Sequence, residues 1–203
     1  SSMYLKAGET LSLQDTLYGL MLASGNDAAV AIAGECGGMT AFVGKMNAKA
    51  AELGLTDTHF DNPNGLPSDT HYTTAHELAK ITAAALKDPV FRQIVSTKSC
   101  TVSGHALSNH NRLLSMYDGA IGVKTGYTRA AGRCLVSAAE HSGRTIIAVT
   151  LNDPNDWNDH MEMLDAGFAQ YSEVTLHTAG DTIANARVFG GDTASVPLTA
   201  KNT

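Results

Sequence analysis

Residues 119–128 read Gly-Ala-Ile-Gly-Val-Lys-Thr-Gly-Tyr-Thr. Branched residues at Ile121, Val123 and Thr125 alternate with glycine and lysine, which predicts a strand with one face toward a core. A glycine on each side of Lys124 leaves room for a ligand's backbone against this strand edge. Lys124 offers a positive charge and Thr125 a hydroxyl, so the segment suits an extended peptide that ends in a carboxylate. Taken alone, Lys-Thr-Gly more often marks an ordinary strand whose lysine reaches solvent.

A polar tripeptide, Ser24-Gly25-Asn26, lies between two stretches with helical patterns. The first stretch begins at a capping box in residues 12–15, and the second is alanine-rich and begins at Asp27. Apolar residues at helical spacing predict the buried stripe of the first helix, at Leu13, Leu17, Leu20 and Met21. Ser24 and Asn26 would either cap the second helix or project from rigid helices into a cleft. Local chemistry alone favours capping.

Together, Ser-x-Asn and Lys-Thr-Gly are the later two parts of the three-part signature of penicillin-binding enzymes, whose first part is Ser-x-x-Lys. From about residue 1 to about residue 171, the chain resembles the low-molecular-weight D-alanyl-D-alanine carboxypeptidases, which are serine peptidases of the bacterial cell wall. The resemblance is carried by residues 22–29, 62–67, 71–75 and 124–128.

The resemblance implies an α+β fold of the penicillin-binding/β-lactamase type. We expect an antiparallel sheet with a helical cluster in residues 1–171, and the start of a small β-rich domain in residues 172–203. No serine in this sequence has a lysine three positions after it. Because the family's Ser-x-x-Lys lies upstream of its Ser-Gly-Asn loop, we expect this chain to be a fragment or a shortened relative, inactive by itself.

The activity that the resemblance implies is removal of the terminal D-alanine from peptidoglycan stem peptides, by acyl transfer through a serine outside this chain. Ser24 would relay a proton to the leaving amine, and Asn26 would orient it and hold the substrate amide. Lys124 would be the second cation that lowers the pKa of the missing lysine. These three are the expected catalytic residues.

The expected substrate-binding residues follow Lys124 on the same strand. Thr125 would bind the terminal carboxylate, Gly126 would leave the backbone bare, and the N–H of Tyr127 would be an oxyanion-hole donor. Arg112 is a further candidate for carboxylate recognition. A surface arginine paired with Asp118 is an equally good interpretation of Arg112.

Two other functions stay open. A catalytically silent binder of wall peptides would keep the binding residues Ser24, Asn26, Lys124 and Thr125 but would lack a nucleophile. A β-lactamase shares the signature, but residues 55–73 contain no glutamate of the kind its middle loop uses. That segment is rich in turn-forming residues, so we expect an ordered loop beside the site.

Composition limits the remaining function classes. The chain of 203 residues has a net charge of -6 and no basic run, so we expect no nucleic-acid partner. Its apolar stretches are too short to span a bilayer. Three widely spaced cysteines, Cys36, Cys100 and Cys134, and scattered histidines suggest neither a metal site nor a cofactor. Buried thiols are expected, with a Cys100–Cys134 bridge as the alternative.

Two expectations concern the second half of the chain. Residues 134–138 and 145–150 predict a β-hairpin, and a following helix should pack on the sheet through Met161, Leu164, Phe168 and Tyr171. Because the family's sheet includes strands from before Ser1, we expect association through an open sheet edge or exchange of the tail from Glu173 to Thr203. The resemblance also implies a bacterial, extracytoplasmic location and β-lactams as ligands of the complete enzyme.

Overall fold

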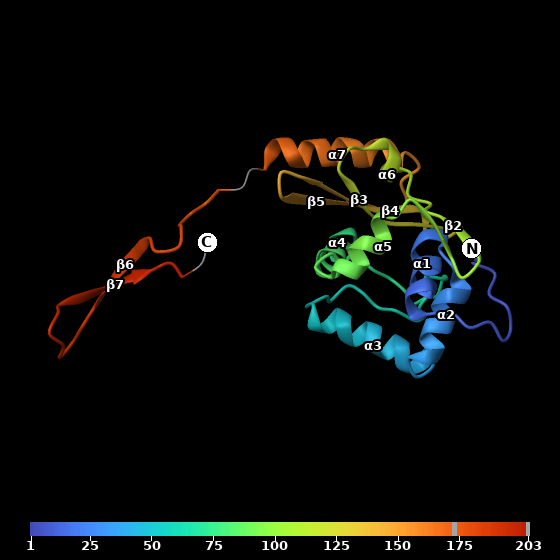
Figure 1. Cartoon of the computed structure of the whole chain (residues 1–203), viewed down its shortest axis with the longest axis horizontal. Helices are drawn as coiled ribbons and strands as arrows, with labels where there is room; N and C mark the ends of the chain where they lie inside the picture. Colours follow the sequence, from blue (N-terminus) through green and yellow to red (C-terminus); the bar gives the residue numbers. More distant parts are fainter. Residues whose placement is uncertain (172–173, 202–203) are drawn as a thin grey trace. The chain divides into compact units, whose positions relative to one another are not determined.

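The computed structural model describes residues 1–171 and 174–201. They form two compact units, Ser1–Phe168 and Ala169–Thr203 (Figure 1). The domain boundary that the sequence predicts after residue 171 stays a prediction.

The first unit contains a three-stranded antiparallel sheet in the order β3-β4-β5. Its strands are β3 (Ala120–Thr128), β4 (Gly132–His141) and β5 (Arg144–Thr150). β4 and β5 form the hairpin that the sequence predicts. Figure 1 shows α7 (Asp156–Gln170) on one face of this sheet and α4 (Ala75–Ala85) and α5 (Pro89–Ser96) on the other, so the sheet is covered on both faces.

A helical cluster precedes the sheet, together with a small hairpin of β1 and β2. Two of its helices begin where the sequence predicts, because Ser12 and Thr74 accept hydrogen bonds from the N–H groups of Asp15 and Glu77. The elements are α1 (Leu13–Ala23), α2 (Asn26–Glu35), α3 (Met39–Glu52), α4 (Ala75–Ala85), α5 (Pro89–Ser96), β1 (Ser99–Val102), β2 (His105–Ser108) and α6 (Leu113–Met116).

The predicted buried stripe of α1 is wrong by about one residue. Leu13 is 61% exposed, whereas Tyr18 and Leu22 are buried. The cause is Gly19, whose bare backbone receives the side chain of Met3, so that any Cβ there would lie 2.2 Å from the Met3 sulfur. The segment before the helix thereby turns Gly19 inward. The other predicted stripe residues are partly buried at the edge of this cluster: Leu17, Leu20 and Met21.

The simple alternation predicted for β3 is also wrong at one point. A β-bulge between Ala120 and Gly122 leaves the adjacent residues Gly122 and Val123 both buried. A Cβ at Gly122 would lie 2.8 Å from Val95 of α5. The first glycine beside the lysine therefore allows helix packing and does not open space for a ligand.

The stripe predicted for α7 holds in part. Leu164 is fully buried against Ala139 and Ala148, and Phe168 packs beside them. Tyr171 lies beyond the end of the helix and belongs to the second unit, so its predicted packing stays a prediction.

In place of an apolar residue, α7 buries His160 completely. Its ring nitrogens bond the hydroxyls of Ser137 at 2.6 Å and Thr150 at 3.0 Å. The sheet thus presents hydroxyl groups to the helix at this point, which favours a polar ring over the methionine that follows it.

The second unit contains one antiparallel hairpin, β6 (Thr182–Arg187) with β7 (Ser195–Thr199). Most of its side chains are exposed. In the part of the chain that the structure describes, all three cysteines are free thiols, partly and not fully buried, and no cluster of metal-ligand side chains occurs. None of the described helices has the length and apolarity needed to cross a membrane.

Candidate active-site cleft

Ser24 lies at the junction of α1 and α2. It ends α1 in the left-handed conformation, with φ 53° and ψ 41°, and the N–H of Gly25 bonds the carbonyl of Gly19 at 3.1 Å. α2 begins directly afterwards with Gly25 as its N-cap, which makes no side-chain capping bond. Ser24 therefore does not cap α2, and its hydroxyl points elsewhere.

The partner of Ser24 is Lys124 on β3. The ammonium group of Lys124 donates one hydrogen bond to the Ser24 hydroxyl and another, of 2.7 Å, to the carbonyl of Thr125. Burial lowers the pKa of Lys124 to about 8, because desolvation disfavours the charged form. The two motifs, one hundred residues apart in sequence, thus meet in a direct contact.

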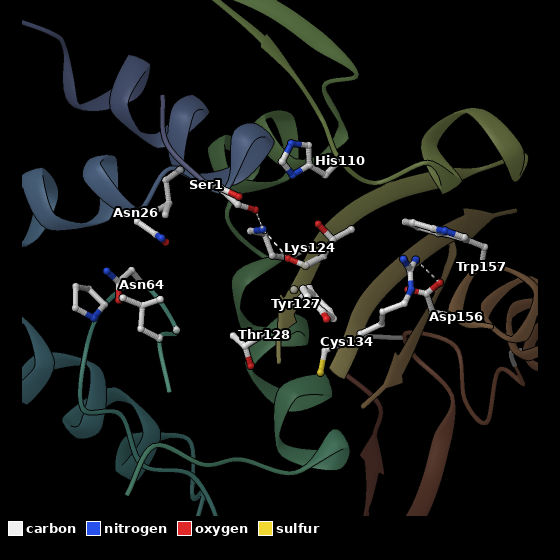
Figure 2. Close-up of a pocket in the computed structure, with 18 residues that line it drawn as sticks. Ser1, Asn26, Asn64, His110, Lys124, Tyr127, Thr128, Cys134, Asp156 and Trp157 are labelled. Atoms are coloured by element: carbon white, nitrogen blue, oxygen red, sulfur yellow. Dashed lines mark hydrogen bonds and ion pairs between the residues drawn. The ribbon is translucent and has the colours of Figure 1, made fainter. Parts of the chain in front are cut away.

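These two residues lie in a cleft of about 650 Å³ between the helical cluster and the β3 edge (Figure 2). All predicted site residues but Arg112 line it: Ser24, Asn26, Lys124, Thr125, Gly126 and Tyr127. Further lining residues come from five other parts of the first unit: Ser1; Pro63, Asn64, Gly65 and Leu66 of a loop; His110; Arg133 and Cys134 of β4; and Asp156 and Trp157 at the start of α7.

The loop over residues 62–66 forms one wall of the cleft, as the sequence predicts. It is ordered by Asn62, whose side-chain amide donates to the carbonyl of Leu66 at 2.8 Å and accepts from its N–H at 3.0 Å. Asn47 of α3 makes the same pair of bonds with the backbone of Phe60, both 2.8 Å. Side-chain amides thus replace a backbone ladder along this loop.

The end of the cleft beyond Tyr127 is built around an ion pair that the sequence motifs do not reveal. Arg133 of β4 bonds the carboxylate of Asp156, at the start of α7, from Nη2 at 2.7 and 2.9 Å and from Nε at 3.1 Å. The ring of Trp157, the chain's single tryptophan, has the guanidinium of Arg133 5.6 Å from its centre. Arg112 does not line the cleft, and its guanidinium lies 5.9 Å from the same ring.

Two other groups have lowered pKa values: His110, which lines the cleft, and Asp27, which follows Asn26 in the chain. Partial burial and the charge of Lys124 lower the pKa of His110. Asp27, next to Asn26, accepts hydrogen bonds from Ser2 Oγ and from the backbone of residues 3, 5 and 28. Burial alone would raise the pKa of Asp27, but these bonds outweigh it and hold the pKa at about 2. Asp27 thereby fixes the start of the chain against α2.

The chain matches the family model of D-alanyl-D-alanine carboxypeptidases, peptidase family S11, over residues 1–155. It is 37% identical over 208 aligned residues to the D-alanyl-D-alanine carboxypeptidase DacF of Bacillus subtilis, covering 98% of this chain and 54% of the relative. A carboxypeptidase of Mycobacterium tuberculosis is 40% identical over 177 residues, covering 81% of this chain and 61% of the relative.

Solved structures show the same likeness. The crystal structure of a D-alanyl-D-alanine carboxypeptidase from Mycobacterium tuberculosis superimposes with a TM-score of 0.80 at 38% identity, covering 87% of this chain and 71% of that one. A variant of a Streptomyces DD-transpeptidase gives 0.79 at 38% identity, covering 83% and 73%. The expected α+β fold is thus confirmed. The chain spans between about half and two thirds of the length of the curated relatives it matches.

Proposed function

The chain belongs to the D-alanyl-D-alanine carboxypeptidase family, and on that premise we propose that it forms the substrate cleft of an enzyme that removes the terminal D-alanine from peptidoglycan stem peptides. The observation that carries this proposal is the contact of the Lys124 ammonium with the Ser24 hydroxyl inside the cleft. A hydroxyl bonded to an ammonium of lowered pKa is suited to move a proton.

In the proposed reaction a serine outside this sequence gives its proton to the lysine of its Ser-x-x-Lys motif and attacks the carbonyl between the two D-alanines. The C–N bond then breaks, D-alanine leaves, and water hydrolyses the acyl-enzyme. Ser24 passes a proton to the leaving amine, and Lys124 keeps the site positive. Asn26, the first residue of α2, lines the cleft and is available to hold the substrate amide. The N–H of Tyr127 serves as an oxyanion donor, because β3 is an edge strand among the described residues and faces the cleft.

For the terminal carboxylate we propose Thr125 together with Arg133, in place of Arg112. Arg133 is paired with Tyr127 across β3 and β4, so its side chain leaves the sheet on the same face as those of Tyr127 and Thr125. Arg133 lines the cleft, whereas Arg112 stacks on Trp157 outside it. A guanidinium is the side chain best matched to a carboxylate.

The same proposal extends to location and ligands. We place the activity on the cell-wall side of a bacterial membrane, in a secreted or membrane-associated protein that influences cell shape. β-Lactams would acylate the enzyme when its nucleophile is present, since they resemble the substrate's reactive amide. A net charge of -6 gives no attraction to nucleic acid.

The test is D-alanine release by the native gene product from diacetyl-L-lysyl-D-alanyl-D-alanine. Lys124→Ala and Ser24→Ala should each lower the rate by roughly a hundredfold or more, the size expected of electrostatic and proton-transfer groups. Lys87→Ala, which removes an exposed lysine after α4, is the control and should leave the rate unchanged. Equal rates in all four proteins would refute the assigned roles.

A second candidate is a silent binder of wall peptides, which would use the same cleft without a nucleophile. The same assay separates the two candidates. A gene product that binds the peptide through Lys124 but releases no D-alanine would be the binder.

A further inference from the structure

The carboxylate of Asp156 forms its side-chain hydrogen bonds with Arg133. Its side chain is only 4% exposed, whereas that of Arg133 is 42% exposed. Both oxygens of Asp156 accept hydrogen bonds from Arg133, and no other donor to them occurs among the described residues. A buried carboxylate with one partner holds that partner firmly, because losing it would leave an unpaired charge in the interior.

All three of these bonds use the same edge of the guanidinium. They come from Nε and Nη2 of Arg133, and Nη1 has no hydrogen-bond partner in residues 1–171 and 174–201. An arginine has five N–H donors in a rigid plane. Fixing one edge therefore leaves the Nη1 donors in a defined position, on a residue that lines the cleft.

Trp157 restrains the same guanidinium from its face. The residue follows Asp156 in α7, and its ring centre lies 5.6 Å from the Arg133 guanidinium carbon. The guanidinium carbon of Arg112 lies 5.9 Å from the centre of the Trp157 ring and packs against that ring. Figure 2 shows Asp156 and Trp157 together at one end of the cleft, with a dashed line joining Asp156 to the neighbouring guanidinium. One edge and the plane of Arg133 are thus both fixed.

We propose that Asp156 is a positioning residue for substrate recognition, which holds Arg133 so that its Nη1 donors receive the terminal carboxylate of the peptide. The inference rests on the proposed function, since it requires a ligand that ends in a carboxylate at Thr125. An arginine fixed in advance loses less conformational entropy when it binds than a free one does. An ion pair that only joined α7 to β4 would predict no effect on the choice of ligand.

The experiment compares two ligands, N-acetyl-D-alanyl-D-alanine and its C-terminal amide, by isothermal titration calorimetry on the full chain. The unchanged protein should prefer the carboxylate by roughly tenfold or more, the range of a charge-assisted hydrogen bond. Asp156→Asn should lose most of this preference while still binding the amide. Asp159→Asn is the matched control: it makes the same charge change on the same helix, at a residue that does not line the cleft.

The ratio of the affinities for the carboxylate and the amide ligand, and not either affinity alone, tests the positioning role of Asp156. A variant that was merely destabilised would weaken both ligands equally, and that outcome would refute the positioning role. Asp156→Glu, which keeps the charge but moves the carboxylate by one methylene, should give an intermediate preference and serves if Asp156→Asn does not fold. An unchanged preference in both variants overturns the inference and leaves the proposed function standing. If the unchanged protein binds neither ligand, the proposed function itself fails.

Discussion

At Lys124, burial withdraws an ammonium group from water while Ser24 and the Thr125 carbonyl accept its hydrogen bonds. The pKa falls to about 8, so the group is charged at neutral pH and becomes neutral as the pH rises through that value. Its positive charge is therefore present when a carboxylate ligand binds at pH 7, and is lost in mild alkali.

This titration predicts a pH-dependent affinity. Binding of N-acetyl-D-alanyl-D-alanine should weaken several-fold between pH 7 and pH 9.5, because Lys124 loses its charge while arginine keeps its own up to about pH 12. The C-terminal amide should show a smaller change. Calorimetry across this range gives the answer, and a constant carboxylate affinity up to pH 10 would contradict the role given to Lys124.

Ser24 leads to a second prediction. Its hydroxyl oxygen accepts a hydrogen bond from an ammonium group, so no base is placed to activate it as a nucleophile. Incubation of this chain with benzylpenicillin should therefore leave its intact mass unchanged. A stoichiometric adduct on Ser24 would overturn its assignment as a proton relay.

The sequence predicts the individual site residues unevenly. Ser24, Asn26 and Lys124 stand in short motifs whose chemistry is visible locally. Arg133 and Asp156 are 23 positions apart and lie in no common motif, because only strand pairing and the start of α7 bring them together. The available signal is the Asp-Trp pair at the start of a predicted helix, and a single arginine such as Arg112 reveals little about its role from sequence alone.

Among the elements, α7 depends on a buried histidine. Burial lowers the pKa of His160 to about 4, against about 6.5 for a free histidine. The folded state thus binds this proton less readily than the unfolded state does. The contribution of His160 to stability is intact above about pH 6.5 and is lost as the pH falls toward 4.

The expected loss between pH 7 and pH 5 is about 2 kcal/mol in the free energy of unfolding. His160→Gln should remove this part of the pH dependence, although the variant will be less stable at pH 7. His76→Gln, at an exposed position of α4, should keep it. Urea denaturation at the two pH values measures the difference, and an identical pH dependence in both variants would show that His160 does not titrate as described.

Helix and strand positions follow from the sequence more closely than their buried faces. Caps at Ser12 and Thr74 fix where two helices begin, because a cap is a local interaction. The buried face of α1 depends instead on Met3 reaching into the hollow at Gly19. Likewise the bulge in β3 places Gly122 against the side chain of Val95 in α5. Both features depend on contacts with segments distant in the sequence. The spacing of apolar residues carries no information about such contacts, so it cannot predict them.

At the scale of the whole molecule, the second unit exposes apolar side chains on its hairpin and on the segment before it. Phe189 is 83% exposed and Leu176 82%. A two-stranded hairpin alone is marginally stable in water, and its strands have unpaired edges. We therefore predict that the chain self-associates through residues 174–201.

Sedimentation velocity tests this association. The sedimentation coefficient of the full chain should rise with concentration, and removal of residues 172–203 should abolish the rise. Phe189→Ser should reduce it, while Asp192→Ser, which changes an exposed charge in the same loop, should not. A full chain that sediments as a monomer throughout would exclude the tail as an association site.

The central claim is that Ser24, Lys124 and the β3 edge together form a cleft for peptides that end in D-alanyl-D-alanine. The most direct measurement is calorimetric titration of the chain with diacetyl-L-lysyl-D-alanyl-D-alanine and with the same peptide ending in L-alanyl-L-alanine. We expect saturable binding of the first peptide, weak or undetectable binding of the second, and loss of binding of the first peptide in Lys124→Ala. Equal binding of both peptides, or binding that survives the loss of Lys124, would contradict this claim.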